Sequence, residues 1–165
     1  MNTLKPNTPR KGLNEESWRR LAMRAATAVL EEEEDLREQY ARAEREFVFT
    51  GCGLYMNFKG IPEEMRLVGR PDRVVSRLVG SVPGMKGALF FDVFVRDGML
   101  ACLEVSSTFD WLPDSAASVV LEKGRYVGEE GAVRWFRAEG IVRENQGNSP
   151  MKVPEADAGL HAAEG

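Results

Sequence analysis

Residues 88–106 read ALFFDVFVRDGMLACLEVS, two apolar segments that meet at Arg96-Asp97-Gly98. This pattern predicts a β-hairpin, because apolar runs joined by Asp-Gly are typical of two strands and a tight turn. A two-residue turn would pair Val95 with Leu100 and mix polar with apolar residues on both faces. A three-residue loop with a left-handed glycine would pair Val95 with Met99 and sort the side chains into two distinct faces. We therefore predict the three-residue loop.

The predicted register gives the hairpin one apolar face and one mixed face. The apolar face is expected to form the main core, and it comprises Phe91, Val93, Val95, Met99, Ala101, Leu103 and Val105. The mixed face comprises Phe90, Asp92, Phe94, Leu100, Cys102 and Glu104, with Asp92 opposite Cys102 and Phe90 opposite Glu104. A functional site is expected on the mixed face, because charge lies there among apolar neighbours.

Asp92 and Glu104 are the first candidate site residues. A carboxylate desolvated among apolar neighbours has a raised pKa and suits general acid or base chemistry. The simpler interpretation is that the face is open to solvent, or that each carboxylate pairs with an arginine such as Arg77 or Arg134. If the two carboxylates act together, a small polar ligand or a divalent ion is the expected occupant.

A long N-terminal helix is predicted before the strands. Asn14 is its expected N-cap, and an apolar stripe at three- and four-residue steps predicts about thirty helical residues. The stripe comprises Trp18, Ala22, Ala25, Val29, Leu36, Tyr40, Ala43 and Phe47. Five consecutive acidic residues, 31–35, interrupt it. We interpret them as a solvated face or a bend between two shorter helices, since consecutive side chains point around a helix and do not converge on a metal.

The rest of the chain predicts further strands. One is expected over residues 46–58, where Gly51 and Gly53 mark a bulge or a close backbone approach. Others are expected over 73–80, 116–122 and 131–142, the last two being strands or a strand and a short helix. The predicted fold class is therefore α+β, a long N-terminal helix packed on an antiparallel sheet of four to six strands. Residues 1–13 are expected to be a disordered lead, 14–144 a single domain, and 145–165 a flexible tail.

Composition excludes several classes of function. A net charge of -4 and a pI near 5.2 argue against nucleic acid and anionic membranes as partners. No apolar run reaches the roughly 18 residues of a membrane-spanning helix, and a cytoplasmic protein is expected. Cys52 and Cys102 are interpreted as buried free thiols. His161 is the only histidine and belongs to the predicted tail, so no catalytic triad, zinc site or cofactor is expected.

The loop after the hairpin supplies the other candidate site residues. Phe109, Asp110 and Trp111 follow the strand that carries Glu104. Aromatic residues among acids are typical of binding surfaces. The same residues are equally typical of a plug that closes the open end of a core, and the sequence leaves both interpretations open.

Two stretches carry a resemblance. Residues 50–58, TGCGLYMNF, and residues 94–104, FVRDGMLACLE, are followed by an aromatic-acid-Trp-Pro loop. Together they resemble a group of short bacterial proteins of unknown function, in which Thr-Gly-x-Gly precedes aromatic residues and the hairpin runs Phe-Val-Arg-Asp-Gly-x-Leu-x-x-Leu-Glu-Gly. Here Val105 replaces the last glycine and the charged helix is additional. The resemblance covers residues 46–114 and implies a shared fold without an activity, although such proteins sometimes accompany toxin loci as immunity partners.

The leading hypothesis is a non-enzymatic binding or protein-interaction module, an immunity-type partner of a bacterial toxin. Its candidate surface comprises Asp92, Glu104, Phe109, Asp110 and Trp111. The alternative is a small-ligand pocket or a carboxylate-based enzyme on the face of Asp92 and Glu104. A protein partner or a small polar ligand is expected, and the sequence leaves the oligomeric state open.

Overall fold

A computed structural model describes residues 11–109, 111–129, 132–137 and 142–143, and within them two helices precede the strands. The elements are α1 (Glu15–Val29), α2 (Glu34–Arg42), β1 (Glu44–Phe49), β2 (Leu54–Lys59), the 3₁₀ turn η1 (Glu63–Met65), β3 (Arg73–Ser81), β4 (Leu89–Arg96), β5 (Met99–Ser107), β6 (Val120–Glu129), β7 (Ala132–Arg137) and β8 (Val142–Arg143). Most of the predicted lead, residues 1–10, and the predicted tail, 145–165, lie outside the described residues.

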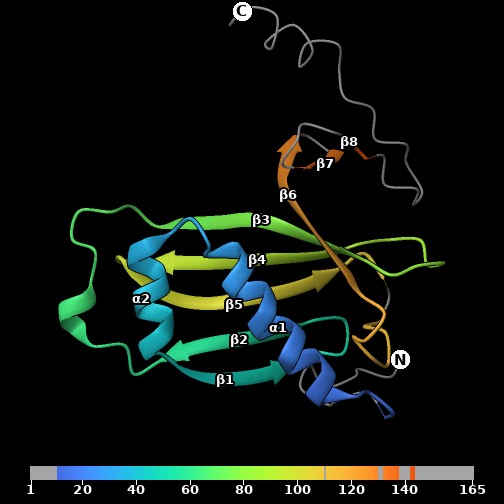
Figure 1. Cartoon of the computed structure of the whole chain (residues 1–165), viewed down its shortest axis with the longest axis horizontal. Coiled ribbons are helices and arrows are strands. Elements are labelled where there is room, and N and C mark those ends of the chain that lie inside the picture. Colours follow the sequence, from blue (N-terminus) through green and yellow to red (C-terminus); the bar gives the residue numbers. More distant parts are fainter. Residues whose placement is uncertain (1–10, 110, 130–131, 138–141, 144–165) are drawn as a thin grey trace, which may run out of the picture.

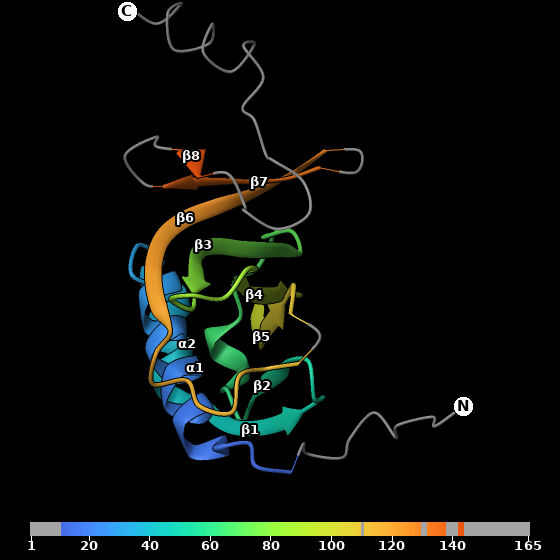
Figure 2. The ribbon, with the colours of Figure 1, turned by 90° about the vertical axis from the view of Figure 1, so that its right-hand side faces the viewer.

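The strands form an antiparallel sheet in the order β1-β2-β5-β4-β3-β6-β7-β8. Both helices lie on one face of the part from β1 to β6 (Figures 1 and 2). β6 then curves away, and its outer half pairs with β7 (Figure 2). The predicted α+β class with an antiparallel sheet is confirmed.

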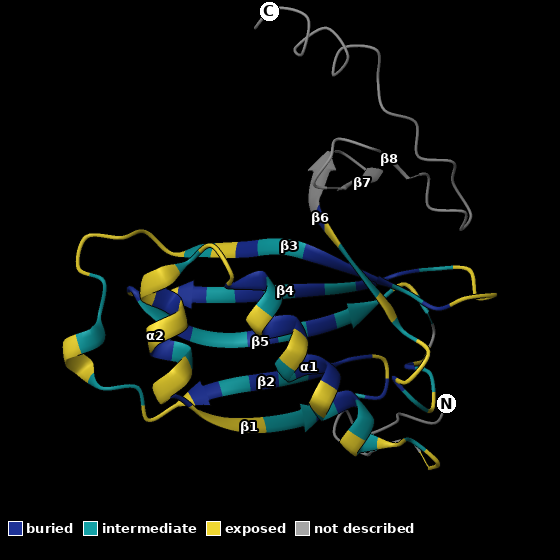
Figure 3. Cartoon of the chain, in the orientation of Figure 1, coloured by how far each residue is buried: buried dark blue, intermediate teal, exposed yellow. Residues whose placement is uncertain are grey.

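The core lies between the helices and the sheet. Trp18, Ala25, Val29 and Leu36 are buried in one cluster with the apolar residues of β4 and β5. Figure 3 shows the buried residues on the inner side of the helices and the exposed ones on their outer side. The predicted packing of the helical stripe on the hairpin is therefore confirmed.

The turn of the central hairpin differs from the prediction. Arg96 pairs with Met99 and Val95 with Leu100, so the turn has two residues, Asp97 and Gly98. Their φ angles of 49° and 71° are both positive. Positive φ at both central residues belongs to the type I′ turn, whose twist matches that of the strands it joins. The predicted pairing of Val95 with Met99 is wrong for this reason.

A bulge beside the turn restores the sorting of the faces. The register shifts between Phe94 and Val95, so that Phe94 pairs with Cys102 and Ala101 is the extra residue of β5. A bulge adds one residue to one strand, and it therefore lets Leu100 and Leu103 both face the core. Met99 and Ala101, which were predicted to be core residues, are only partly buried.

The bulge also corrects the pairing on the mixed face. Asp92 lies opposite Glu104, whereas Cys102 was predicted there. Phe90 lies opposite Ser106, whereas Glu104 was predicted there. The two carboxylates are therefore direct cross-strand neighbours, and they lie closer together than in the predicted register.

The predicted helix of about thirty residues is instead two helices separated by residues 30–33, and Phe47 belongs to β1. The first three residues of the acidic run, 31–33, lie in the bend, which was one of the two interpretations of the sequence, and Glu34 and Asp35 begin α2. Asn14 is the N-cap as predicted, since its Oδ1 accepts from the Ser17 amide at 3.1 Å.

The acidic run at the bend binds cations of the sheet. Arg73 Nη2 lies 2.6 Å from Glu33 Oε2, and Arg77 Nη2 lies 2.9 Å from Glu33 Oε1. Arg77 also reaches Glu32, and Lys123 of β6 pairs with Glu31. These ion pairs hold the bend against β3 and β6.

Glu33→Gln is expected to lower the free energy of unfolding by about 1 kcal/mol at neutral pH. The hydrogen bond from Arg73, with the charges of Arg73 and Arg77, lowers the pKa of Glu33 below its ordinary 4.5 although burial opposes this. A lowered pKa contributes stability above the unfolded-state value, and this stability is lost as the pH falls through the folded-state value. Urea denaturation at pH 7 and pH 3 should show a difference between variant and wild type at pH 7 alone. An equal difference at both would contradict the ionic origin.

The segment predicted as one strand over 46–58 is the hairpin of β1 and β2. Thr50 N donates to Gly53 O at 3.0 Å, and Gly51 has a φ of 89°, so the glycines form a turn and not a bulge. Gly53 is nevertheless a close backbone approach, because a Cβ there would lie 2.4 Å from the Val105 carbonyl oxygen. The predicted strand over 73–80 is confirmed as β3.

Gln39 of α2 is a buried polar residue beside the turn of the central hairpin, and the sequence pattern did not identify it. Its side chain is fully buried. Nε2 donates to the carbonyl oxygens of Met65 and Gly98 at 2.8 and 2.9 Å, and Oε1 accepts from the Leu100 amide at 2.8 Å. The amide therefore joins α2 to η1 and to the turn of the central hairpin.

Candidate functional site

The candidate site lies on the sheet face opposite α1 and α2. No helix of the described part covers this face, which we call the open face (Figure 2). The register aligns Tyr55 of β2, Glu104 of β5, Asp92 of β4 and Ser76 of β3 across four neighbouring strands. We call these four residues the polar row. The predicted site residues Asp92 and Glu104 are its two central members.

Each carboxylate of the polar row accepts a hydrogen bond from a hydroxyl. Tyr55 Oη donates to Glu104 Oε1 at 2.9 Å, and Ser76 Oγ donates to Asp92 Oδ1. Among the side chains that the structure describes, neither carboxylate has a cationic partner. Arg77, one predicted partner, binds Glu32 and Glu33 instead. The side chain of Arg134, the other, lies outside the described part.

Burial and negative charge perturb the titratable groups of this face. Burial raises the pKa of Asp92, the charge of Glu104 raises it further, and the Ser76 hydrogen bond opposes both. Burial, and then Glu104, raises the pKa of the Cys102 thiol. The hydrogen bond to Glu104 is the main cause of the raised pKa of Tyr55. The face therefore disfavours further negative charge.

Apolar and aromatic side chains flank the polar row on both sides. Phe94 pairs with Cys102 and with Val74, whose side chain is 49% exposed. Phe90, on the other side, pairs with Ser106 and Val79. Both phenylalanines are half-buried. Half-buried aromatic residues beside polar groups are typical of protein-binding surfaces.

Asp92→Asn is expected to raise the free energy of unfolding at pH 7 by about 0.5 to 1 kcal/mol, because it removes a desolvated charge that also lies directly opposite Glu104. An amide oxygen still accepts from Ser76. A carboxyl whose pKa is raised above its ordinary 3.8 costs stability as the pH rises through its folded-state value. Urea denaturation at low salt, at pH 7 and pH 3, should show a gain that shrinks at pH 3. Destabilisation at pH 7 would show that the ionised Asp92–Ser76 bond outweighs the repulsion.

The loop after β5 closes one end of the core. Leu112 is fully buried, and its amide donates to Gly51 O at 3.1 Å. Trp18 Nε1 donates to Pro113 O at 2.8 Å, which ties the loop to α1. The plug is Leu112, while Trp111 lies against Gly51 and stays 45% exposed. Asp110, a predicted site residue, lies outside the described residues.

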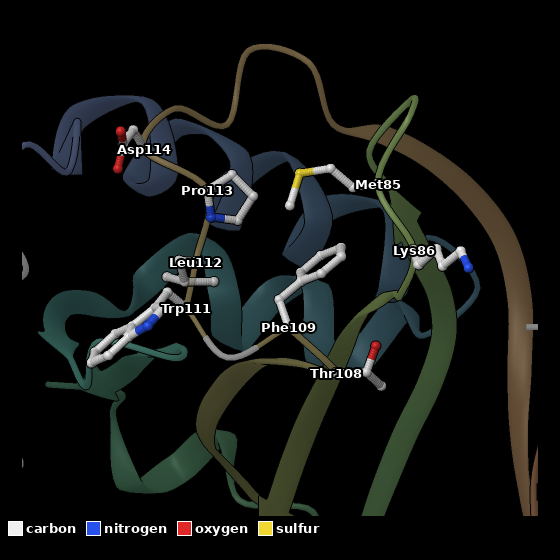
Figure 4. A pocket seen from close by; sticks show the side chains of 8 residues that line it. All are labelled: Met85, Lys86, Thr108, Phe109, Trp111, Leu112, Pro113 and Asp114. Atoms are coloured by element: carbon white, nitrogen blue, oxygen red, sulfur yellow. The ribbon is translucent and has the colours of Figure 1, made fainter. Parts of the chain in front are cut away.

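This loop borders a cleft of about 470 Å³ at the end of the sheet (Figure 4). Phe109, Trp111 and Pro113 line one side, and Met85 and Lys86 line the other. Asp92 and Glu104 do not border it. The structure thus divides the predicted site into the open face, with the two carboxylates, and the cleft, with Phe109 and Trp111.

Tyr55, Ser76 and Phe94 belong to the open face but were not among the predicted site residues. The alternation of β2, LYMNFK, already places Tyr55 and Asn57 on a face opposite the apolar residues. Their relation to Glu104 depends on β2 pairing with β5, strands that are distant in the sequence. The alternation in the sequence could therefore have indicated the face on which Tyr55 lies. Its position beside Glu104 could be inferred only from the order of the strands.

The fold and this face define a two-layer α+β protein with one open sheet face. Comparisons with protein-family models, with curated proteins and with solved structures give no match. Within the described part of the chain, neither helix combines the length and apolarity needed to cross a bilayer. Histidine, cysteine and carboxylate side chains there do not gather in groups of three that could hold a metal.

Proposed function

We propose that this chain is a binding module that docks a protein partner on the open face and catalyses no reaction. The carrying observation is the polar row, in which two carboxylates without a described cationic partner lie between half-buried aromatic residues. Desolvated charge is costly unless it is paired. A protein partner that supplies positive and apolar groups would complement both features.

We further propose that the partner is a bacterial toxin and that the chain acts as its immunity protein. The sequence resemblance suggested this role. An acidic protein with a net charge of -4 suits a basic partner, because complementary charge accelerates association and excludes wrong partners.

Affinity capture with the wild-type chain and with Phe94→Lys tests the binding role. The substitution replaces the flanking ring with a cation that pairs with the polar row and repels a basic partner, so the partner is expected to be lost. Val68→Lys is the matched control, because Val68 is 89% exposed and lies between η1 and β3. Purified partner should then bind wild type and Val68→Lys equally in titration calorimetry. Equal binding to Phe94→Lys would contradict the assignment of the face.

The alternative is a carboxylate-based enzyme or small-ligand pocket on the same face. The raised pKa of Asp92 beside a second carboxylate favours it, because unequal carboxyl pairs serve as general acid and base. Asp92→Asn and Glu104→Gln should then abolish turnover while the unfolding transition is kept. Retained turnover would dispose of this alternative, and turnover without any protein partner would overturn the binding role.

A further inference from the structure

We infer that the group recognised by the polar row is an arginine side chain of the partner, bound over Asp92 and Glu104. This inference rests on the proposed function and names the chemistry of its partner. The two carboxylates face each other directly across β4 and β5. Like charges in this position are destabilising, and one cation placed over both would relieve the repulsion.

Most of the described cations nearest the row in the sheet are bound elsewhere. Arg73 and Arg77 of β3 bind Glu33 at the helix bend, and Lys123 of β6 binds Glu31. Lys59 of β2, which shares the open face, lies 2.5 Å from Glu46 of β1. Arg96 ends β4 on the open face, beyond Phe94, and among the described contacts it forms no ion pair with Asp92 or Glu104. The charge of the polar row is therefore left for a cation of the partner.

The surroundings favour arginine over lysine. Tyr55 belongs to the row and Phe94 flanks it, so aromatic rings border the two carboxylates. A guanidinium stacks on aromatic rings, donates in a planar fork to carboxylates and is weakly hydrated. An ammonium is more strongly hydrated and offers no plane to stack.

The same charges disfavour a second copy of this chain as the occupant. Two open faces packed together would bring Asp92 and Glu104 of one copy against those of the other. Four desolvated carboxylates would then repel one another, with no described cation on the row to compensate. A partner that carries a cation together with apolar groups is thus a better match for this face than a second copy of the chain.

Peptide selection can test the inference without the natural partner. Random peptides displayed on phage are selected on the wild-type chain, and those that also bind Phe94→Lys are removed. The remaining peptides are expected to share an arginine. In titration calorimetry, replacing that arginine with lysine, or using the Asp92→Asn/Glu104→Gln chain, should weaken binding by about tenfold or more. Glu64→Gln, at an exposed position of η1, removes charge away from the row and should leave the affinity unchanged.

The outcomes separate this inference from the proposed function. Peptides that need the open face but lack arginine, or that bind the double variant equally, would overturn the inference and leave the binding role standing. If no peptide distinguishes wild type from Phe94→Lys, both are overturned. A wild-type dimer in sedimentation velocity that Phe94→Asp dissociates would identify a second copy as the occupant and also overturn the inference.

Discussion

Gln39→Leu is expected to lower the free energy of unfolding by about 4 kcal/mol. The substitution keeps much of the side-chain volume but removes all three hydrogen bonds of the buried amide. The Leu100 amide and the Met65 carbonyl would lose a buried partner, and an unsatisfied buried polar group costs far more than the net value of one hydrogen bond. Urea denaturation followed by circular dichroism measures the change.

Two variants control this experiment. Glu38→Gln, at the exposed neighbouring position of α2, should change stability by less than about 0.5 kcal/mol. Gln39→Glu should be destabilising at pH 7 and less so at pH 4, because the protonated acid regains one donor and loses its buried charge. If Gln39→Leu were as stable as wild type, the three hydrogen bonds would contribute no net stability.

Gly98→Ala is expected to destabilise the chain by about 3 kcal/mol or more. Gly98 has a φ of 71°, where a side chain is strained. A Cβ would also lie 2.3 Å from the carbonyl oxygen of Leu67, and backbone atoms cannot move aside as a flexible side chain can. Thermal denaturation should show a much lower midpoint, because Leu67, which follows η1, and the hairpin turn are forced apart.

Gly69→Ala separates the two causes. Gly69 has a φ of 75°, almost the same backbone conformation, and a Cβ there meets nothing within 4 Å. Its substitution should cost only the left-handed penalty of about 1 kcal/mol. Equal losses at both positions would show that conformation alone matters and that the contact with Leu67 yields easily.

The hairpin shows what the sequence could and could not predict. Alternation located both strands and identified Phe91, Val93, Leu103 and Val105 as core residues, because apolar burial is read directly from period two. The predicted three-residue loop is wrong because an uninterrupted ladder of pairs, without a bulge, would have required it to sort the two faces. A two-residue turn with a bulge at Ala101 sorts the faces equally well, and no local signal in the sequence marks that bulge.

Single residues of the candidate site could be predicted from the sequence, but their arrangement in space could not. Asp92 and Glu104 stood out because each is a charge within an apolar strand, and both do belong to the open face. The hydroxyl partners come from β2 and β3, whose places in the sheet depend on long-range pairing. The helix bend was similar, since the acidic run was visible but its cationic partners on β3 and β6 were not.

The hydrogen bonds of Gln39 have a consequence for the order in which the chain can fold. The amide bonds to groups 59 and 61 residues further along the chain, at Gly98 and Leu100. Contacts of such high sequence separation form late and slow folding. During synthesis α2 therefore emerges long before Gly98 and Leu100. The face of α2 that is buried in the folded chain stays uncovered until the central hairpin has been made. A nascent chain that ends before Leu100 would expose that face, and chaperone binding to the helices is expected at that stage.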